Sequence, residues 1–174
     1  MKKLEFVLNL CFYHFYLFLK TINAKLTHLF FAQLYNLSIA KRRTAKFGIK
    51  DPHKYTMEIE NNPDNGVVVN VSFLLFEAWL VLIIYSITNI MNTIFQNEIY
   101  KFIFNTPLVI ITCFILLIFI VLILTKVFLE HHSKYLIYSR YFRSRNKEIK
   151  IKNAIHAILI YLFSVILIIL AYSF

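Results

Sequence analysis

The stretch PLVIITCFILLIFIVLILTKVFL, from Pro107 to Leu129, decides the fold class of this protein. It holds one charged residue, Lys126, close to its end. A transmembrane helix needs about 20 mostly apolar residues to cross a hydrocarbon core of ~30 Å. Backbone groups in lipid must also be hydrogen-bonded within their own segment, which favours a helix. The stretch therefore predicts a membrane-spanning helix over 107–129.

Two further windows, 71–94 and 154–174, have the same character. The whole chain is 59% hydrophobic with a mean hydropathy of +0.64, whereas soluble domains are usually about half apolar. We therefore predict an all-α integral membrane protein with three transmembrane helices. A short outer loop at 95–106 joins the first two. The linker at 130–153 contains no Gly or Pro, so it is expected to continue the second helix.

The glycine content bears on how these helices pack. The sequence has only two glycines. Close packing of membrane helices commonly depends on small residues at the interface. We therefore expect contacts between the helices to rely on large aliphatic and aromatic side chains.

Positive charge is concentrated in two segments. The basic residues are Lys41, Arg42, Arg43, Lys46, Lys50 and Lys54 in one, and Lys134, Arg140, Arg143, Arg145, Lys147, Lys150 and Lys152 in the other. The loop at 95–106 holds a single basic residue, Lys101. Since basic residues stay on the cytoplasmic or matrix side, both segments are predicted to lie there. Arg42, Arg43, Arg140, Arg143 and Arg145 are the residues expected to contact anionic lipids or partner subunits, rather than nucleic acid.

The N-terminal region is open to two interpretations. Residues 1–40 contain two amphipathic stretches of about 15 residues each, or ~22 Å as helices. They predict either two helices lying in the membrane interface or a hairpin of two short spans. Residues 41–70 combine the first basic segment with alternating side chains around turn residues such as Pro63 and Gly66. This pattern predicts either a small β-hairpin or an irregular linker.

Glu77 is the ionisable residue that stands out within the apolar windows. It lies about six residues, or ~9 Å, into the first span, next to Trp79, which prefers the interface. We expect a shallow structural carboxylate that meets interfacial water or pairs with a basic residue of 41–54. The alternatives are an inter-subunit contact and proton or ion handling. Ser86, Asn89 and Thr93 form a second polar patch, expected either to bond another helix or to meet the outer headgroups.

No motif for catalysis, metal binding or cofactor binding is present in the sequence. His131 and His132 are adjacent rather than four apart, so they do not face one metal together. His14 and His156 have apolar neighbours and are interpreted as locally bonded residues rather than haem ligands. Cys11 and Cys113 match no paired pattern and are interpreted as buried hydrophobes. We therefore expect no enzyme activity, no metal and no cofactor.

The function predicted from the sequence is that of a non-catalytic subunit of a larger membrane complex. Lys outnumbers Arg 14 to 5, and residues with AT-rich codons are abundant. This composition favours an organelle-encoded subunit of the respiratory chain or ATP synthase, in the mitochondrial inner membrane. The alternative is a homo-oligomeric pore or membrane effector in the inner membrane of a low-GC bacterium. An enzyme acting on lipid or quinone has the least support, since no polar residues converge.

Overall fold

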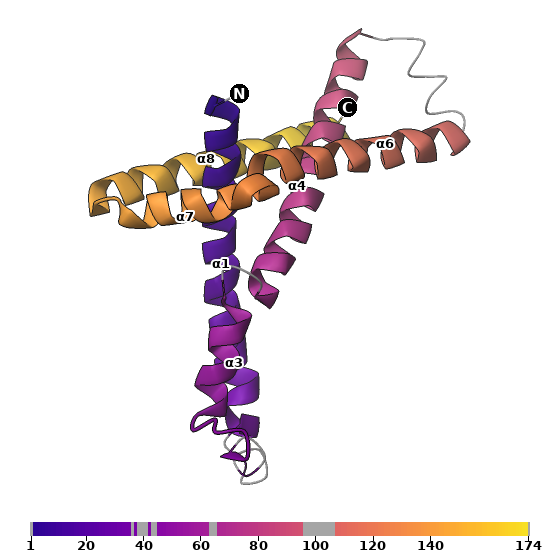
Figure 1. Cartoon of the computed structure of the whole chain (residues 1–174). Coiled ribbons are helices and arrows are strands. Elements are labelled where there is room, and N and C mark those ends of the chain that lie inside the picture. The colour runs from indigo at the N-terminus through magenta and orange to yellow at the C-terminus, as the bar shows by residue number, and fades with distance from the viewer. Residues whose placement is uncertain are drawn as a thin grey trace. The chain divides into compact units, whose positions relative to one another are not determined.

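A computed structural model describes residues 2–35, 37, 42, 45–62, 66–95 and 107–173 of the chain. Every regular element among them is helical (Figure 1). The helices are α1 (Lys2–Tyr35), α3 (Pro52–Glu60), α4 (Val67–Phe95), α6 (Pro107–Thr125), α7 (Lys134–Ser144) and α8 (Lys147–Ser173). A π-helical turn, Lys126–Glu130, and a 3-10 turn, His131–Ser133, lie between α6 and α7.

The chain divides into two compact units. One unit consists of Met1–Cys11 and Leu75–Phe174, and the other of Phe12–Leu74. The first unit therefore holds the beginning of α1, most of α4, and all of α6, α7 and α8. These are the elements that position the candidate functional residues.

Three helices are long and apolar enough to cross a membrane, as the sequence predicted. They cover Val67–Met91, Leu108–Ser144 and Lys147–Ser173. The first and third begin four and seven residues earlier than the windows at 71–94 and 154–174. The helices extend beyond the apolar windows because backbone hydrogen bonds of a helix also form in water. The loop predicted at 95–106 lies almost entirely outside the described residues.

The prediction that one helix continues from the second span through the linker is wrong. His132 and Ser133 adopt the left-handed conformation, with φ of 56° and 52°, and this breaks the helix between α6 and α7. A second break at Arg145, which is extended, separates α7 from α8. Figure 1 shows the chain reversing direction at this second break. Neither break uses Gly or Pro, whose absence from the linker was the basis of the prediction.

Residues 2–35 form one helix, whereas the sequence predicted two. The 34 residues of α1 span about 51 Å, and no Gly or Pro interrupts them. The alternative of two short spans joined by a turn does not describe this helix. Whether α1 lies in the interface remains a prediction.

The predicted β-hairpin is also absent from the described part of 41–70. Pro52–Glu60 is helix α3, because Asp51 caps its first turn by accepting from the Lys54 amide at 3.1 Å and Pro52 fits the first helical position. This capping signal outweighs the alternation of Tyr55, Met57 and Ile59. Gly66, just before α4, lies against the backbone of Glu60 and Asn62, where a Cβ atom would collide.

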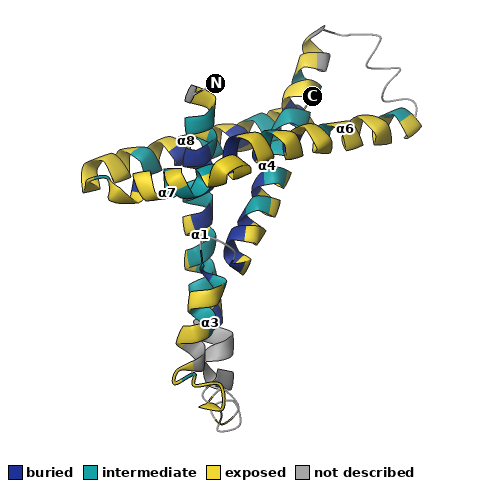
Figure 2. Ribbon diagram, in the orientation of Figure 1, coloured by how far each residue is buried: buried dark blue, intermediate teal, exposed yellow. Residues whose placement is uncertain are grey.

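The packing of α8 corrects the expectation that only large side chains join the helices. Its buried residues are Ala157, Ser164 and Ala171, which follow one another at intervals of seven. A seven-residue repeat keeps these small residues on one face of the helix. Around this face α8 is mostly exposed, and α6 is more exposed still (Figure 2). Small residues thus form the contact stripe even though glycine is scarce.

Candidate functional site

Glu77 meets a neutral partner on another helix. The Thr125 hydroxyl, at the end of α6, donates a hydrogen bond of 2.8 Å to Glu77 Oε1. Eighteen residues separate Glu77 from Phe95, and the same number separates Thr125 from Pro107, which is about 27 Å of helix. Glu77 and Thr125 therefore lie at one level, nearly a full hydrocarbon thickness from those ends. The shallow position of Glu77 in a membrane stays a prediction.

A groove between α4 and α6 opens beside Glu77. Its volume is about 370 Å³. The lining side chains are Glu77, Ala78, Val81 and Leu82 of α4, and Phe114, Ile118, Val121 and Leu122 of α6. Glu77 contributes the only ionisable group to this lining. The groove can therefore receive apolar groups along its length and a hydrogen-bond donor or cation at the level of the carboxylate.

Among the described residues of its own unit, Glu77 does not form the expected pair with a basic residue. The ion pair found among the described residues joins Lys134 and Glu5 at 3.0 Å. The basic segment at 41–54 belongs to the other unit, and part of it lies outside the described residues. Pairing of Glu77 with that segment stays a prediction, and Thr125 is the partner that the structure provides.

Of the second polar patch, Asn89 reaches another helix. Its Nδ2 donates to the backbone oxygen of Ala171 in α8 at 2.6 Å. Ala171 lies within the last turn of α8, where carbonyl groups have no partner inside the helix. Ser86 is buried, but its hydroxyl donates to Leu82 of its own helix, and Thr93 donates to the Asn89 backbone oxygen. In the described part of the chain, Asn89 is thus the patch residue that bonds another helix.

Trp79 joins the same two helices at a second level. Its indole Nε1 donates to Ser164 Oγ at 3.0 Å, and its ring lies 4.8 Å from that of Tyr161. Ser164 in turn donates to the Tyr161 backbone oxygen at 2.7 Å. Trp79 contacts Ser164, and Asn89, further along α4, contacts Ala171, which is further along α8. The two helices therefore run in the same direction through their contact.

Four of the five candidate lipid-contacting arginines lie in the described part of the chain. Arg42, Arg140 and Arg143 are exposed, and Arg43 lies outside the described residues. The Arg145 guanidinium stacks 4.0 Å from the ring centroid of Tyr141. An arginine over an aromatic face gains a cation–π attraction and keeps its charge available at the surface.

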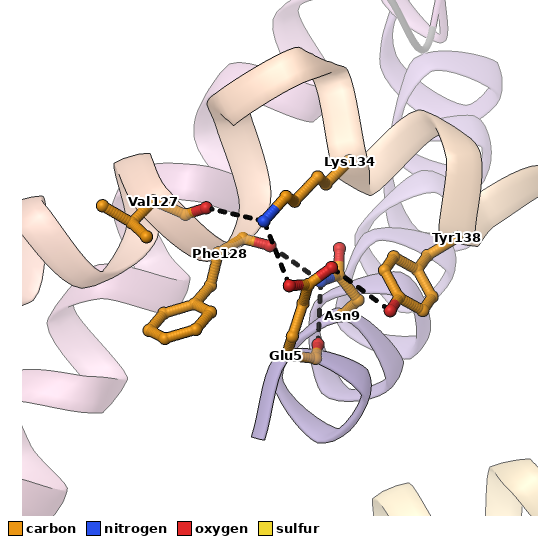
Figure 3. A network of polar contacts seen from close by, with 6 residues as sticks. All are labelled: Glu5, Asn9, Val127, Phe128, Lys134 and Tyr138. Carbon is orange, nitrogen blue, oxygen red and sulfur yellow. Dashed lines mark hydrogen bonds and ion pairs between the residues drawn. The ribbon is translucent and has the colours of Figure 1, made fainter. Parts of the chain in front are cut away.

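A polar network at the break after α6 was not predicted (Figure 3). The His131 amide donates to Lys126, five residues back, so the carbonyls of Val127 and Phe128 stand at the end of a helical segment. Such carbonyls need partners from outside the helix. Lys134 Nζ lies 3.2 Å from the Val127 oxygen, and Asn9 Nδ2 lies 2.9 Å from the Phe128 oxygen.

Glu5 completes this network from α1. Its carboxylate pairs with Lys134 at 3.0 Å and accepts a bond of 3.3 Å from the Tyr138 hydroxyl. Asn9 is fully buried and also donates to the Glu5 backbone oxygen at 2.8 Å, while its Oδ1 has no partner. The four-residue spacing of Glu5 and Asn9 on a polar stripe was visible in the sequence. The carbonyls that Asn9 and Lys134 satisfy were not, because the break was unpredicted.

The two cysteines differ in burial. Cys11 is buried, as expected, whereas Cys113 is exposed. The prediction of a buried Cys113 is therefore wrong, because this residue lies on α6, most of whose side chains are exposed.

The described part of the chain contains no candidate metal-binding cluster. No group of three or more His, Cys, Asp or Glu side chains comes together there. His131 and His132 are both exposed, with ring centroids 4.0 Å apart. No protein-family model matches the chain, and no curated protein or solved structure shows a significant match.

Proposed function

We propose that this protein is a non-catalytic structural subunit of a larger membrane protein complex. The observation that carries the proposal is the use of its polar side chains. Asn9, Trp79 and Asn89 each donate to a group on another helix. They hold helices together rather than converging on a space where a substrate could react.

The exposed apolar surface of the helices supports the same proposal. Only 11% of the apolar window of Leu108–Ser144 is buried, against 33% for Val67–Met91. Such a helix is covered by lipid or by the helices of partner subunits. The groove between α4 and α6 could also receive side chains from a partner helix, and such packing stabilises contacts between membrane helices.

The composition supports a more specific version. Residues with AT-rich codons favour an organelle-encoded subunit of the respiratory chain or ATP synthase, in the mitochondrial inner membrane, or a protein of a bacterial inner membrane. The thirteen basic residues of the two segments, against Lys101 in the loop, place the segments on the matrix or cytoplasmic side in this proposal.

Cysteine accessibility tests the sidedness. Cys11 and Cys113 are replaced by Ser, and single cysteines are introduced at Asn97 and Ser144. A membrane-impermeant maleimide added from one side should label only one of them. Labelling of both from the same side contradicts the three-span arrangement.

Purification tests the subunit role. The tagged chain is extracted in mild detergent, and co-eluting chains are quantified by mass spectrometry. We expect a fixed stoichiometric set of other membrane proteins. A chain that elutes without other proteins contradicts the proposal.

A further inference from the structure

We propose that two copies of this chain associate across the groove between α4 and α6, with Glu77 of each copy pairing with Lys126 of the other. This goes beyond the subunit role, because a copy of the same chain can dock whether or not other subunits are present. The occupant of the groove is thus identified by the charges of the chain itself.

The first part of the argument is the state of Glu77. Its carboxylate is half-buried, and its hydrogen-bond partner among the described residues is the neutral Thr125 hydroxyl. The rest of the groove lining is apolar. Ionisable side chains inside membrane proteins usually pair with an opposite charge or face water. The carboxylate therefore offers a place for a cation at the end of the groove.

Lys126 offers that cation. It follows Thr125 directly, is exposed, and forms no ion pair among the described residues. It also comes four residues after Leu122, which lines the groove, and residues four apart are neighbours on a helix surface. Lys126 therefore stands at the flank of the groove, at the level of Glu77.

Because Glu77 and Lys126 lie at the same level, a two-fold symmetric dimer can bring them together. A two-fold axis along the membrane normal keeps every residue at the same depth in both copies. Since Glu77 and Lys126 lie at one depth within a copy, they also lie at one depth between copies. A two-fold interface is self-complementary, so one Glu77–Lys126 contact implies its reciprocal. Both charges are then paired at once.

The apolar surface fits the same interface. Phe114, Ile118 and Leu122 line the groove, yet they are 49%, 37% and 45% exposed. Side chains from a second α6 can fill the volume of about 370 Å³, and packing of this kind drives association of membrane helices. An aminophospholipid, whose ammonium and phosphate carry the same two charges, is the competing occupant, and disulfide cross-linking distinguishes it from a second copy.

Disulfide cross-linking of the full chain in its own membrane tests the interface. In a background with Cys11 and Cys113 changed to Ser, Leu122→Cys is compared with Ile120→Cys. The two positions have similar exposure, 45% and 52%, but lie on different faces of α6. We expect oxidation to give a dimer of the chain for Leu122→Cys and about ten-fold less for Ile120→Cys. Equal cross-linking at both positions overturns the proposal.

Charge reversal identifies the pair. In the Leu122→Cys background, Glu77→Lys alone and Lys126→Glu alone should each reduce cross-linking by about ten-fold, which corresponds to ~1.4 kcal/mol. Two differently tagged chains, one carrying each substitution, are then expressed together. Cross-linking between the two tags should return, because one chain then presents a cation at both positions and the other presents a carboxylate at both. Pairing within one chain cannot produce this rescue.

The remaining outcomes are also decisive. Glu77→Gln removes only the charge and is the milder variant if charge reversal prevents insertion; it too should reduce cross-linking. Unchanged cross-linking in Glu77→Gln, or no rescue by the two tagged chains when both insert, overturns the proposal in favour of a lipid or a different protein. Copurification of other subunits is measured separately, so failure of this dimer and failure of the subunit role remain distinguishable.

Discussion

The α4–α8 contact and the junction of α1 with the break after α6 both depend on polar side chains, but of different kinds. Trp79 and Asn89 donate neutral hydrogen bonds to a hydroxyl and to a backbone oxygen on α8. At the break, a buried carboxamide, Asn9, works beside a Glu5–Lys134 ion pair. Neutral groups thus join the apolar helices, and charge is used where the apolar run of α6 has ended.

The difference follows from the cost of burying charge. An ion in the hydrocarbon region costs several times more than a neutral amide or indole whose hydrogen bond is made. In both regions the acceptor includes a carbonyl at the end of a helical segment, Ala171 or Phe128. We infer that helix ends are among the points at which polar residues of this chain fix tertiary contacts.

The largest expected effect comes from Asn9→Leu. This change leaves the Phe128 carbonyl buried without its donor and should destabilise the docking of α1 by about 2 kcal/mol. Cys11 reports the loss: burial raises the pKa of its thiol to about 12, so little reactive thiolate exists at pH 8. Alkylation of Cys11 in mild detergent should be slow in the native protein and faster in the variant. Val7→Ala, at an exposed position of α1, should leave the rate unchanged.

Asn89→Leu should have a smaller effect. Hydrogen bonds between membrane helices contribute about 0.6 kcal/mol on average and at most ~1.7 kcal/mol. Loss of the bond to Ala171 should therefore lower the free energy of unfolding by about 1 kcal/mol in an SDS titration. Thr88→Val, which removes a hydroxyl bonded within α4, is the control. If Asn89→Leu costs as much as Asn9→Leu, the two regions do not differ as described.

The Glu5–Lys134 pair should contribute less again. Its side chains are 19% and 24% exposed, so water and salt screen it, and such pairs contribute about 0–1 kcal/mol. Glu5→Gln should destabilise α1 docking by about 0.5 kcal/mol, and the difference from the native protein should shrink in high salt. A salt-independent difference would show that hydrogen bonding, rather than charge, holds Glu5.

The smallest effect on the fold of a single chain is expected from Glu77→Leu. Thr125 would keep a partner, because its hydroxyl also lies 3.1 Å from the backbone oxygens of Val121 and Leu122. We expect a change below about 0.5 kcal/mol in unfolding of the chain in detergent. Glu77→Gln should be equally mild. A large loss of stability in Glu77→Leu would show that the carboxylate supports the fold of the chain itself.

The missed break shows why local signals were insufficient between α6 and α7. His132 and Ser133 have no intrinsic preference for the left-handed conformation that would mark a helix end as glycine does. Their backbone is held because Asn9 and Lys134 satisfy the carbonyls exposed there. The sequence separation between Asn9 and Phe128 is 119 residues, so no pattern within one segment can reveal the contact.

The sequence by itself determined the three long apolar helices, because the length of an apolar run acts locally. It also contained the capping signal of α3 at Asp51 and Pro52, although the alternating side chains concealed it. Only the tertiary structure decided which polar residues join helices. Trp79, Asn89 and Asn9 are recognisable as contacts only once their acceptors, Ser164, Ala171 and Phe128, are placed beside them. A hydrogen bond depends on two groups meeting in space, and the sequence records each of them alone.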